Sequence, residues 1–294
     1  MESRSICNPI RNLHESRIQC SLLPTEPRET MFSILQFDGL TLLAIVGVML
    51  FAGLVHGTLG LGFPMVATPI LATMMDVRSA ILVTLLPTMA VNIASIANSR
   101  SALASTRPFI PLVGFTLLGS IAGATILAIT DPAPFRIVLA SLILLYLWDS
   151  LRISRPWLEQ NSLLAMAGFG IAAGLAGGTT NVMVAVLIIY FLSLDTARAT
   201  MVPTLNACFL AGKTMQILVL AIAGLVGSSL VIETTPLAMA AVVALLFGQR
   251  LRARIEISTY QAILRKLLLL LAAILIYQFV NESGLLAWAG QDRG

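Results

Sequence analysis

Long apolar stretches dominate the chain, and charged residues fall between these stretches rather than within them. No Asp, Glu, Lys or Arg occurs from residue 39 to residue 75, and none occurs from residue 161 to residue 194. As continuous helix the first stretch would be roughly 55 Å long, at about 1.5 Å per residue. The hydrocarbon core of a bilayer is only about 30 Å thick, so a helix of about 20 residues crosses it. Both stretches are therefore predicted to be interrupted.

Glycine clusters mark the two expected interruptions. The first lies in residues 57–64, GTLGLGFP, and the second lies in residues 174–181, GLAGGTTN. Glycine and proline lower helix propensity, and proline also removes a backbone donor. Uncoiled backbone at membrane depth is tolerated only where protein or a water-filled cavity surrounds it. Matching interruptions in two halves of a chain are typical of the central binding site of a transporter.

The other apolar stretches are shorter and are bounded by charge. They span residues 79–99, 108–130, 137–148, 199–232, 234–249 and 267–281. Each interrupted stretch contributes one or two further segments. The sequence therefore predicts an all-α, polytopic helical membrane protein with eight to ten membrane segments and broken helices.

Composition narrows the class of protein further. Apolar residues make up 57% of the 294 residues and charged residues only 11%, whereas soluble domains carry about 25% charged residues. A soluble domain is excluded, and the cysteines at positions 7, 20 and 208 do not form a disulfide framework. The net charge of +4 comes from arginines at the ends of apolar stretches, without the basic face interleaved with aromatic residues that nucleic-acid binding requires. By the positive-inside rule three loops are expected in the cytoplasm, those with Arg100 and Arg107, with Arg152 and Arg155, and with Arg250, Arg252 and Arg254.

The order of features repeats along the membrane region, which indicates a tandem duplication. Four residues recur 125 positions later, namely Gly123, Asp131, Phe135 and Leu139 as Gly248, Glu256, Tyr260 and Leu264. The two glycine clusters themselves are related by an offset of 121. We expect a polar, disordered tail at residues 1–30, a first repeat at residues 31–155 and a second repeat at residues 156–294.

Glycines also recur at a spacing of four residues, at 53 and 57, at 119 and 123, and at 170, 174 and 178. This spacing places small residues on one helix face and allows two helices to approach closely. Helix packing alone accounts for these glycines.

Polar residues beside the two interruptions are candidates for binding a small anion, because the helix N-termini at such breaks carry partial positive charge. Lys213 lies near the middle of an apolar stretch, where a lysine costs about 2.5 to 3.5 kcal/mol. It either faces a cavity or extends to the membrane surface. The threonines either donate to the anion or satisfy freed carbonyls. The candidate binding residues are Thr58, Gly60, Gly62, Gly177, Gly178, Thr179, Thr180, Asn181, Asn206 and Lys213.

Other polar residues in the spans have less specific interpretations. Gln216 shares a helix with Lys213, and residues 84, 88 and 92 lie on the corresponding helix of the first half, so hydrogen bonds between helices account for most of them. His56 is a candidate for proton coupling, although the sequence favours a neutral histidine packed between helices. A serine nucleophile at Ser229 would need His56 as its base. Neither metal-ligand spacing nor a nucleotide-binding loop occurs, so we expect no cofactor and favour a transporter over an enzyme.

The glycine-rich segment at residues 53–64, GLVHGTLGLGFP, with Pro69 and Leu71 after it, resembles the signature of the TauE/SafE sulfite exporter family of anion permeases. Residues 248–255, GQRLRARI, with Tyr260 and the following apolar helix, are similar to the C-terminal segment of the same family. The similarity spans roughly residues 40 to 280. After the second break this chain has Thr179, Thr180, Asn181 and Met183, where the family has more glycines.

The resemblance implies a secondary permease in the bacterial cytoplasmic membrane that moves sulfite, a sulfonate or a related sulfur-containing anion outward. A permease for small carboxylates is the alternative, because a lysine and a helix terminus serve a carboxylate as well. The expected partners are the small anion and the lipid bilayer, with no nucleic acid. The sequence leaves open whether the protein forms a homo-oligomer.

Overall fold

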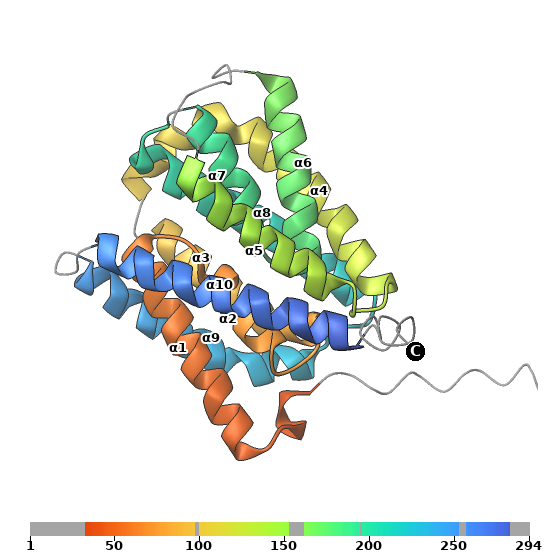
Figure 1. Cartoon of the computed structure of the whole chain (residues 1–294). Coiled ribbons are helices and arrows are strands. Elements are labelled where there is room, and N and C mark those ends of the chain that lie inside the picture. Colours follow the sequence, from red (N-terminus) through yellow and green to blue (C-terminus); the bar gives the residue numbers. More distant parts are fainter. Residues whose placement is uncertain (1–32, 98–99, 153–161, 195, 253–256, 283–294) are drawn as a thin grey trace, which may run out of the picture. The chain divides into compact units, whose positions relative to one another are not determined.

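The computed structural model describes residues 33–97, 100–152, 162–194, 196–252 and 257–282. The expected tail at residues 1–30 lies outside these residues, as do Arg155, Arg254 and Glu256. Helices make up the regular structure of the described residues, which confirms the all-α prediction (Figure 1). In chain order they are η1 (Ile34–Gln36), α1 (Gly39–Leu59), α2 (Phe63–Ala72), α3 (Val77–Ala97), η2 (Arg100–Phe109), α4 (Ile110–Ile129), α5 (Phe135–Arg152), α6 (Leu163–Thr180), α7 (Val184–Ser193), α8 (Arg198–Ile222), α9 (Ser228–Leu251) and α10 (Ile257–Glu282).

Helix length follows the same order in both halves of the chain. A long helix, a helix of 10 residues and three long helices occur from α1 to α5 and again from α6 to α10. In the described part of the chain, seven helices are long and apolar enough to cross a membrane, which are α1, α3, α4, α6, α8, α9 and α10. A helix of 10 residues is about 15 Å long, so α2 and α7 cannot cross the bilayer alone. The polytopic helical fold is confirmed, whereas the duplication stays a prediction.

Both predicted interruptions are present, and each contains a residue with positive φ. The helix α1 ends at Leu59 and is followed by Gly60 with φ of 84° and, two residues later, Gly62 with φ of 104°. The helix α6 ends at Thr180 and is followed by Asn181 with φ of 66°. Glycine adopts this conformation without strain, and asparagine is the side chain that most readily replaces it there.

The position of the second break differs from the prediction. The glycines of residues 174–178 lie inside α6, and the chain leaves the helix only at Asn181. These glycines are needed for packing, because a Cβ atom on Gly178 would lie 2.7 Å from the backbone nitrogen of Ala124 in α4. The predicted span at residues 199–232 is also wrong. The helix α8 ends at Ile222, a turn with Gly224 at φ of 74° follows, and α9 begins at Ser228.

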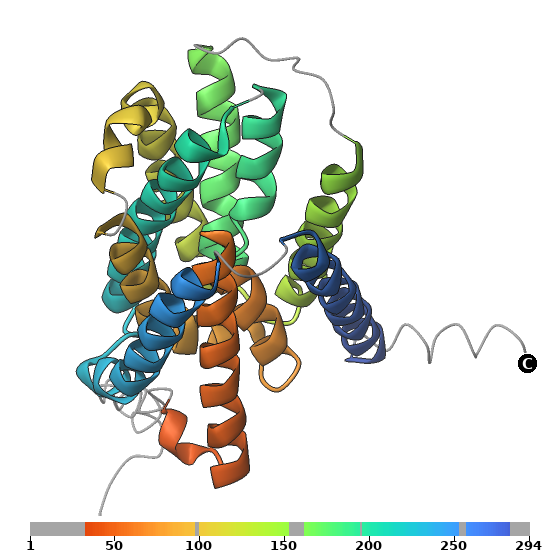
Figure 2. The same cartoon turned by 90° about the vertical axis from the view of Figure 1, so that its left-hand side faces the viewer.

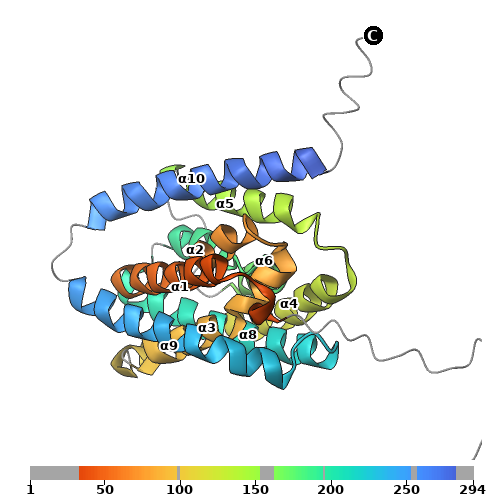
Figure 3. The same ribbon diagram turned by 90° about the horizontal axis from the view of Figure 1, so that it is seen from below.

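After each break the short helix folds back beside the long one. The helix α2 lies alongside α1, and α7 contacts α6 in the same way (Figures 1 and 2). The helices α3 and α8 contact each other, and each also contacts the fourth helix of the other half, α9 or α4. Figure 3 shows α5 and α10 side by side along one edge of this arrangement. The two breaks are thereby enclosed by helices.

Glycines allow several helices to approach closely, which confirms the prediction from their spacing. A Cβ atom on Gly123 of α4 would lie 2.5 Å from the carbonyl oxygen of Leu175 in α6. A Cβ atom on Gly248 of α9 would lie 2.5 Å from the carbonyl oxygen of Leu54 in α1. The offsets of 125 and 121 found in the sequence relate these two contacts residue by residue. The same close crossing therefore occurs once beside each break.

Candidate functional site

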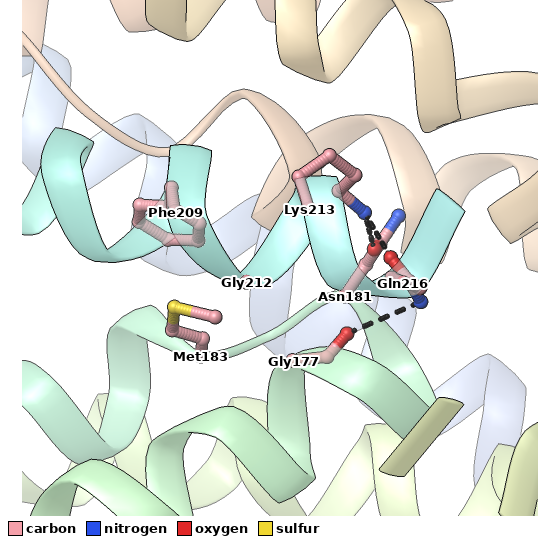
Figure 4. A pocket seen from close by; sticks show the side chains of 7 residues that line it. All are labelled: Gly177, Asn181, Met183, Phe209, Gly212, Lys213 and Gln216. Atoms are coloured by element: carbon pink, nitrogen blue, oxygen red, sulfur yellow. Dashed lines mark hydrogen bonds between the residues drawn. The ribbon is translucent and has the colours of Figure 1, made fainter. Parts of the chain in front are cut away.

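A small cavity lies at the second break, and we call it the lysine pocket (Figure 4). Its volume of about 10 Å³ gives room for about one water molecule. Residues of α6, of the segment that follows it and of α8 form its wall. They are Gly177, Asn181, Met183, Phe209, Gly212, Lys213 and Gln216.

Lys213 is buried in this pocket, with 4% of its surface exposed. Its Nζ donates to Oδ1 of Asn181 and to Oε1 of Gln216, and Figure 4 shows the three side chains pointing toward one another. The side chain therefore turns inward, and the alternative in which Lys213 extends to the membrane surface is wrong. Both oxygens that receive its hydrogen bonds belong to neutral amides, so they solvate the ammonium group without neutralising its charge.

Asn181 connects the pocket to the first half of the chain. Its Nδ2 donates to Oγ1 of Thr84 in α3 at 2.9 Å and to Oγ1 of Thr68 in α2 at 3.1 Å. Its Oδ1 receives the hydrogen bond from Lys213. One side chain at the second break thus holds α2, α3 and α8 together, because its left-handed backbone turns it out of α6.

Gln216 binds both the lysine and the end of α6. Its Nε2 donates to the carbonyl oxygens of Gly178 at 2.9 Å and of Gly177 at 3.4 Å. These carbonyls belong to the last turn of α6, where helix carbonyls lack partners within the helix, although that of Gly177 also accepts the N–H of Asn181. Gln216 was predicted only as a hydrogen-bonding residue between helices, and the structure adds that it lines the pocket.

A second polar group lies at the first break, and we call it the histidine cluster. It comprises His56, Ser95 and Asn206, together with the carbonyl of Gly60. The backbone N–H of Phe63 donates to Nδ1 of His56 at 3.3 Å, and Nε2 of His56 lies 3.0 Å from Oγ of Ser95. Because Nδ1 accepts a hydrogen bond, we assign the proton of the neutral ring to Nε2, which then donates to Ser95. His56 thus supplies the acceptor for the first N–H of α2.

Asn206 of α8 holds the first break from the opposite side. Its Nδ2 donates to the carbonyl oxygen of Gly60 at 3.1 Å, and its side chain also interacts with His56. Asn206 and Lys213 lie on either side of the midpoint of α8. They are seven residues apart, so they are separated by about 10 Å along the helix axis. Both breaks therefore pack against the middle of one apolar helix.

The candidate residues from the sequence separate into three groups. Gly177, Asn181 and Lys213 line the lysine pocket. Gly60 and Asn206 meet at the histidine cluster, and Gly62 precedes the first residue of α2. The hydroxyl groups of Thr58, Thr179 and Thr180 donate to carbonyls of their own helices, and Gly178 packs against α4.

Sequence reasoning missed Met183, Phe209 and Gly212 as pocket residues. A signal exists for Phe209, because residues 206, 209, 213 and 216 follow the helical spacing of three and four residues on α8.

The geometry does not place His56 as the base that a nucleophile at Ser229 would need. Both ring nitrogens of His56 are engaged, by Phe63 and by Ser95 rather than by Ser229.

Comparison with known proteins places this geometry in a family. A family model described as sulfite exporter TauE/SafE matches residues 45–278, a range that includes both breaks and the lysine pocket. No curated protein and no solved structure matches the chain. Because the matched residues make up well over half of its length, the chain belongs to the sulfite exporter TauE/SafE family.

Proposed function

We propose that this protein is a secondary transporter that moves sulfite, a sulfonate or a related small anion out across the bacterial cytoplasmic membrane. Its family and its apolar helices identify it more generally as a multi-pass membrane transporter. The proposal assigns anion binding to the lysine pocket. It assigns movement by alternating access to the two broken helices, α1 with α2 and α6 with α7.

The burial of Lys213 among neutral partners is the observation that carries this proposal. A charged ammonium group inside a membrane protein is expensive unless another charge balances it. The amide oxygens of Asn181 and Gln216 orient the group but leave its charge uncompensated. An anion in the pocket would complete the ion pair, so the site favours a ligand of negative charge.

Binding requires the pocket to widen. A sulfur oxyanion has at least four non-hydrogen atoms, which exceeds a cavity with room for about one water. Lys213 must also turn away from at least one of its two amide partners to reach the anion. The hydrogen bonds that hold the pocket closed and the contacts that bind substrate therefore compete for the same ammonium group. This competition links substrate binding to movement of the second break.

Flux measurements in proteoliposomes test the proposal. Sulfite, thiosulfate, sulfoacetate and short carboxylates should be compared under imposed proton or sodium gradients. Accumulation of a sulfur-containing anion against its own gradient is the expected result. Transport of carboxylates alone would favour the alternative permease, and flux that no gradient can drive uphill would indicate a channel.

A further inference from the structure

We propose that Ser120 of α4 is a second anion-binding residue at the lysine pocket, and that the methyl group of Met183 occupies the anion's place until the anion binds. This inference rests on the proposed function, because it adds a residue and a gating step to the same site. The supporting observations are a buried hydroxyl without a partner among the described residues and the atoms that surround it.

The hydroxyl group of Ser120 differs from those of other serines within the helices. Ser120 is fully buried, and its Oγ has no hydrogen-bond partner among the described residues. A helical serine commonly donates to a carbonyl one turn earlier, as Ser141 and Ser193 do at 2.7 Å. Buried polar atoms are nearly always satisfied, because an unsatisfied one costs stability. The hydroxyl of Ser120 is therefore available to a ligand.

This hydroxyl and the end of the Met183 side chain converge on one point at the wall of the lysine pocket. A Cβ atom on Gly212 would lie 2.6 Å from Oγ of Ser120 and 2.7 Å from Cε of Met183. Gly212 and Met183 both line the pocket. The hydroxyl of Ser120 therefore lies beside the methyl group of Met183, at the place that the missing side chain of Gly212 leaves open.

The methyl group of Met183 fills the space between α6 and α8. Its Cε would lie 2.6 Å from a Cβ atom on Gly177 in α6, as well as 2.7 Å from one on Gly212 in α8. Figure 4 shows the side chain between the two helices. Methionine is unbranched and flexible, so its end moves more easily than packed backbone does. Turning the methyl group away would widen the pocket and open the hydroxyl of Ser120 to the space that Lys213 lines.

A sulfo group fits the two donors that this movement would bring together. Its oxygens diverge from one sulfur atom, so one can accept from the ammonium group of Lys213 while another accepts from the hydroxyl of Ser120. Ser120 adds a donor without adding charge, so the pocket still balances one negative charge. Phe209 and Met183 provide apolar wall beside the donors. The substrate class that this arrangement favours is therefore a sulfonate of single charge with a small apolar substituent.

The helix crossing beside the first break indicates that packing does not require a hydroxyl at this place. The backbone carbonyl of Ser120 packs against Gly178 of α6, and the backbone carbonyl of Leu245 in α9 packs against Gly57 of α1. The offsets of 125 and 121 relate these two contacts. Ser120 and Leu245 therefore occupy equivalent positions, and a leucine serves at the first break. The hydroxyl is a feature of the crossing that adjoins the lysine pocket.

Binding of methanesulfonate to the purified protein tests the role of Ser120 without requiring transport. The rise of the unfolding midpoint with potassium methanesulfonate, compared with potassium chloride at equal concentration, gives the affinity. Ser120→Ala should weaken binding by about tenfold or more, as expected for a hydrogen bond to a charged group. It should not lower the midpoint in chloride, because the lost hydroxyl has no partner to leave behind. Thr116→Val, which removes a buried hydroxyl bonded within α4 one turn earlier, should keep the affinity unchanged as the matched control.

Two further variants test the methyl group and keep the proposal testable if Ser120→Ala does not fold. Met183→Ala removes the group that the anion must displace, so it should tighten binding by about fourfold, which corresponds to the packing of one methyl group. Met166→Ala, which shortens another buried methionine, should not tighten binding. Ser120→Cys keeps the size of the side chain and replaces a strong donor with a weak one, so it should weaken binding.

The outcomes separate this inference from the proposed function. Unchanged affinity in Ser120→Ala or Ser120→Cys, together with loss of binding in Lys213→Met, would overturn the role of Ser120 and leave the proposed function standing. Unchanged or weaker binding in Met183→Ala would overturn the gating role of its methyl group. Absence of a methanesulfonate-specific shift in the unmodified protein would overturn both the inference and anion binding at the lysine pocket.

Discussion

Replacing Lys213 with methionine tests the central residue of the proposed site. Methionine keeps the length and the apolar stem of lysine and removes its charge and donors. A hydrogen bond to a charged group contributes about 1.5 to 3 kcal/mol. Loss of this bond to an anion should weaken substrate binding by roughly 10- to 150-fold, since about 1.4 kcal/mol corresponds to a factor of ten.

The same substitution should change stability much less than it changes binding. Oδ1 of Asn181 and Oε1 of Gln216 each lose a donor, and an unsatisfied buried acceptor costs about 1 to 3 kcal/mol. Removing a lysine from the middle of a membrane helix returns about 2.5 to 3.5 kcal/mol. These contributions have opposite signs and similar size, so the variant should fold with an unfolding midpoint near that of the unmodified protein.

Initial rates of anion flux into proteoliposomes, measured over a range of substrate concentrations, give the required comparison. The matched control is Lys266→Met, because Lys266 of α10 is exposed and distant in sequence from both breaks. The control should transport normally. If Lys213→Met folded and showed an unchanged dependence on substrate concentration, Lys213 would not be the binding cation, and the proposed role of the pocket would be wrong.

Three further predictions concern the break, the helix contacts and the substrate. Asn181→Gly keeps the left-handed backbone and removes the hydrogen bonds to α2, α3 and α8, so flux should fall while folding is retained, whereas Asn181→Ala should also lower the unfolding midpoint. Gly57→Ala places a Cβ atom 2.9 Å from Gly248 Cα and should destabilise the protein by about 1 to 3 kcal/mol. Gly47→Ala, with open space around it, should stabilise its helix by about 0.5 to 1 kcal/mol; equal unfolding midpoints for these two variants would contradict the packing argument. Lys213 is the one charged residue that lines the pocket, so the pocket balances one negative charge rather than two. In a competition assay the monoanion methanesulfonate should therefore inhibit flux more strongly than the dianion sulfate, and stronger inhibition by sulfate would refute this charge balance.

The sequence predicts the broken helices well because bilayer thickness limits helix length. Stretches of 37 and 34 uncharged residues cannot be single helices in a core of about 30 Å. The location of the second break was less predictable, because glycine has two uses. In residues 57–64 two of the glycines form the turn, whereas in residues 174–178 all three stay helical and pack against neighbours or the turn. Only the contact partners distinguish these uses.

The candidate site was predicted in part for a related reason. A buried lysine is conspicuous in an apolar stretch, whereas the roles of threonines depend on which acceptor each hydroxyl reaches. Thr179 and Thr180 can reach carbonyls of their own helix one turn earlier, and that local bond is available to any threonine in a helix. Gln216 instead bonds to another helix, because its longer side chain extends across to α6. Side-chain length therefore separates residues that serve their own helix from residues that join helices.

Asn181 shows how one residue can combine structural and functional roles at such a break. A glycine at this position would end α6 equally well, but it would remove the amide donor that Thr68 and Thr84 share and one of the two acceptors of Lys213. At the first break glycines provide the turn, and the joining side chains come from His56 and Asn206 instead. The second break is therefore tied to Lys213 through its own turn residue. Any displacement of the ammonium group toward a substrate acts directly on the backbone that separates α6 from α7, which is the segment that alternating access would have to move.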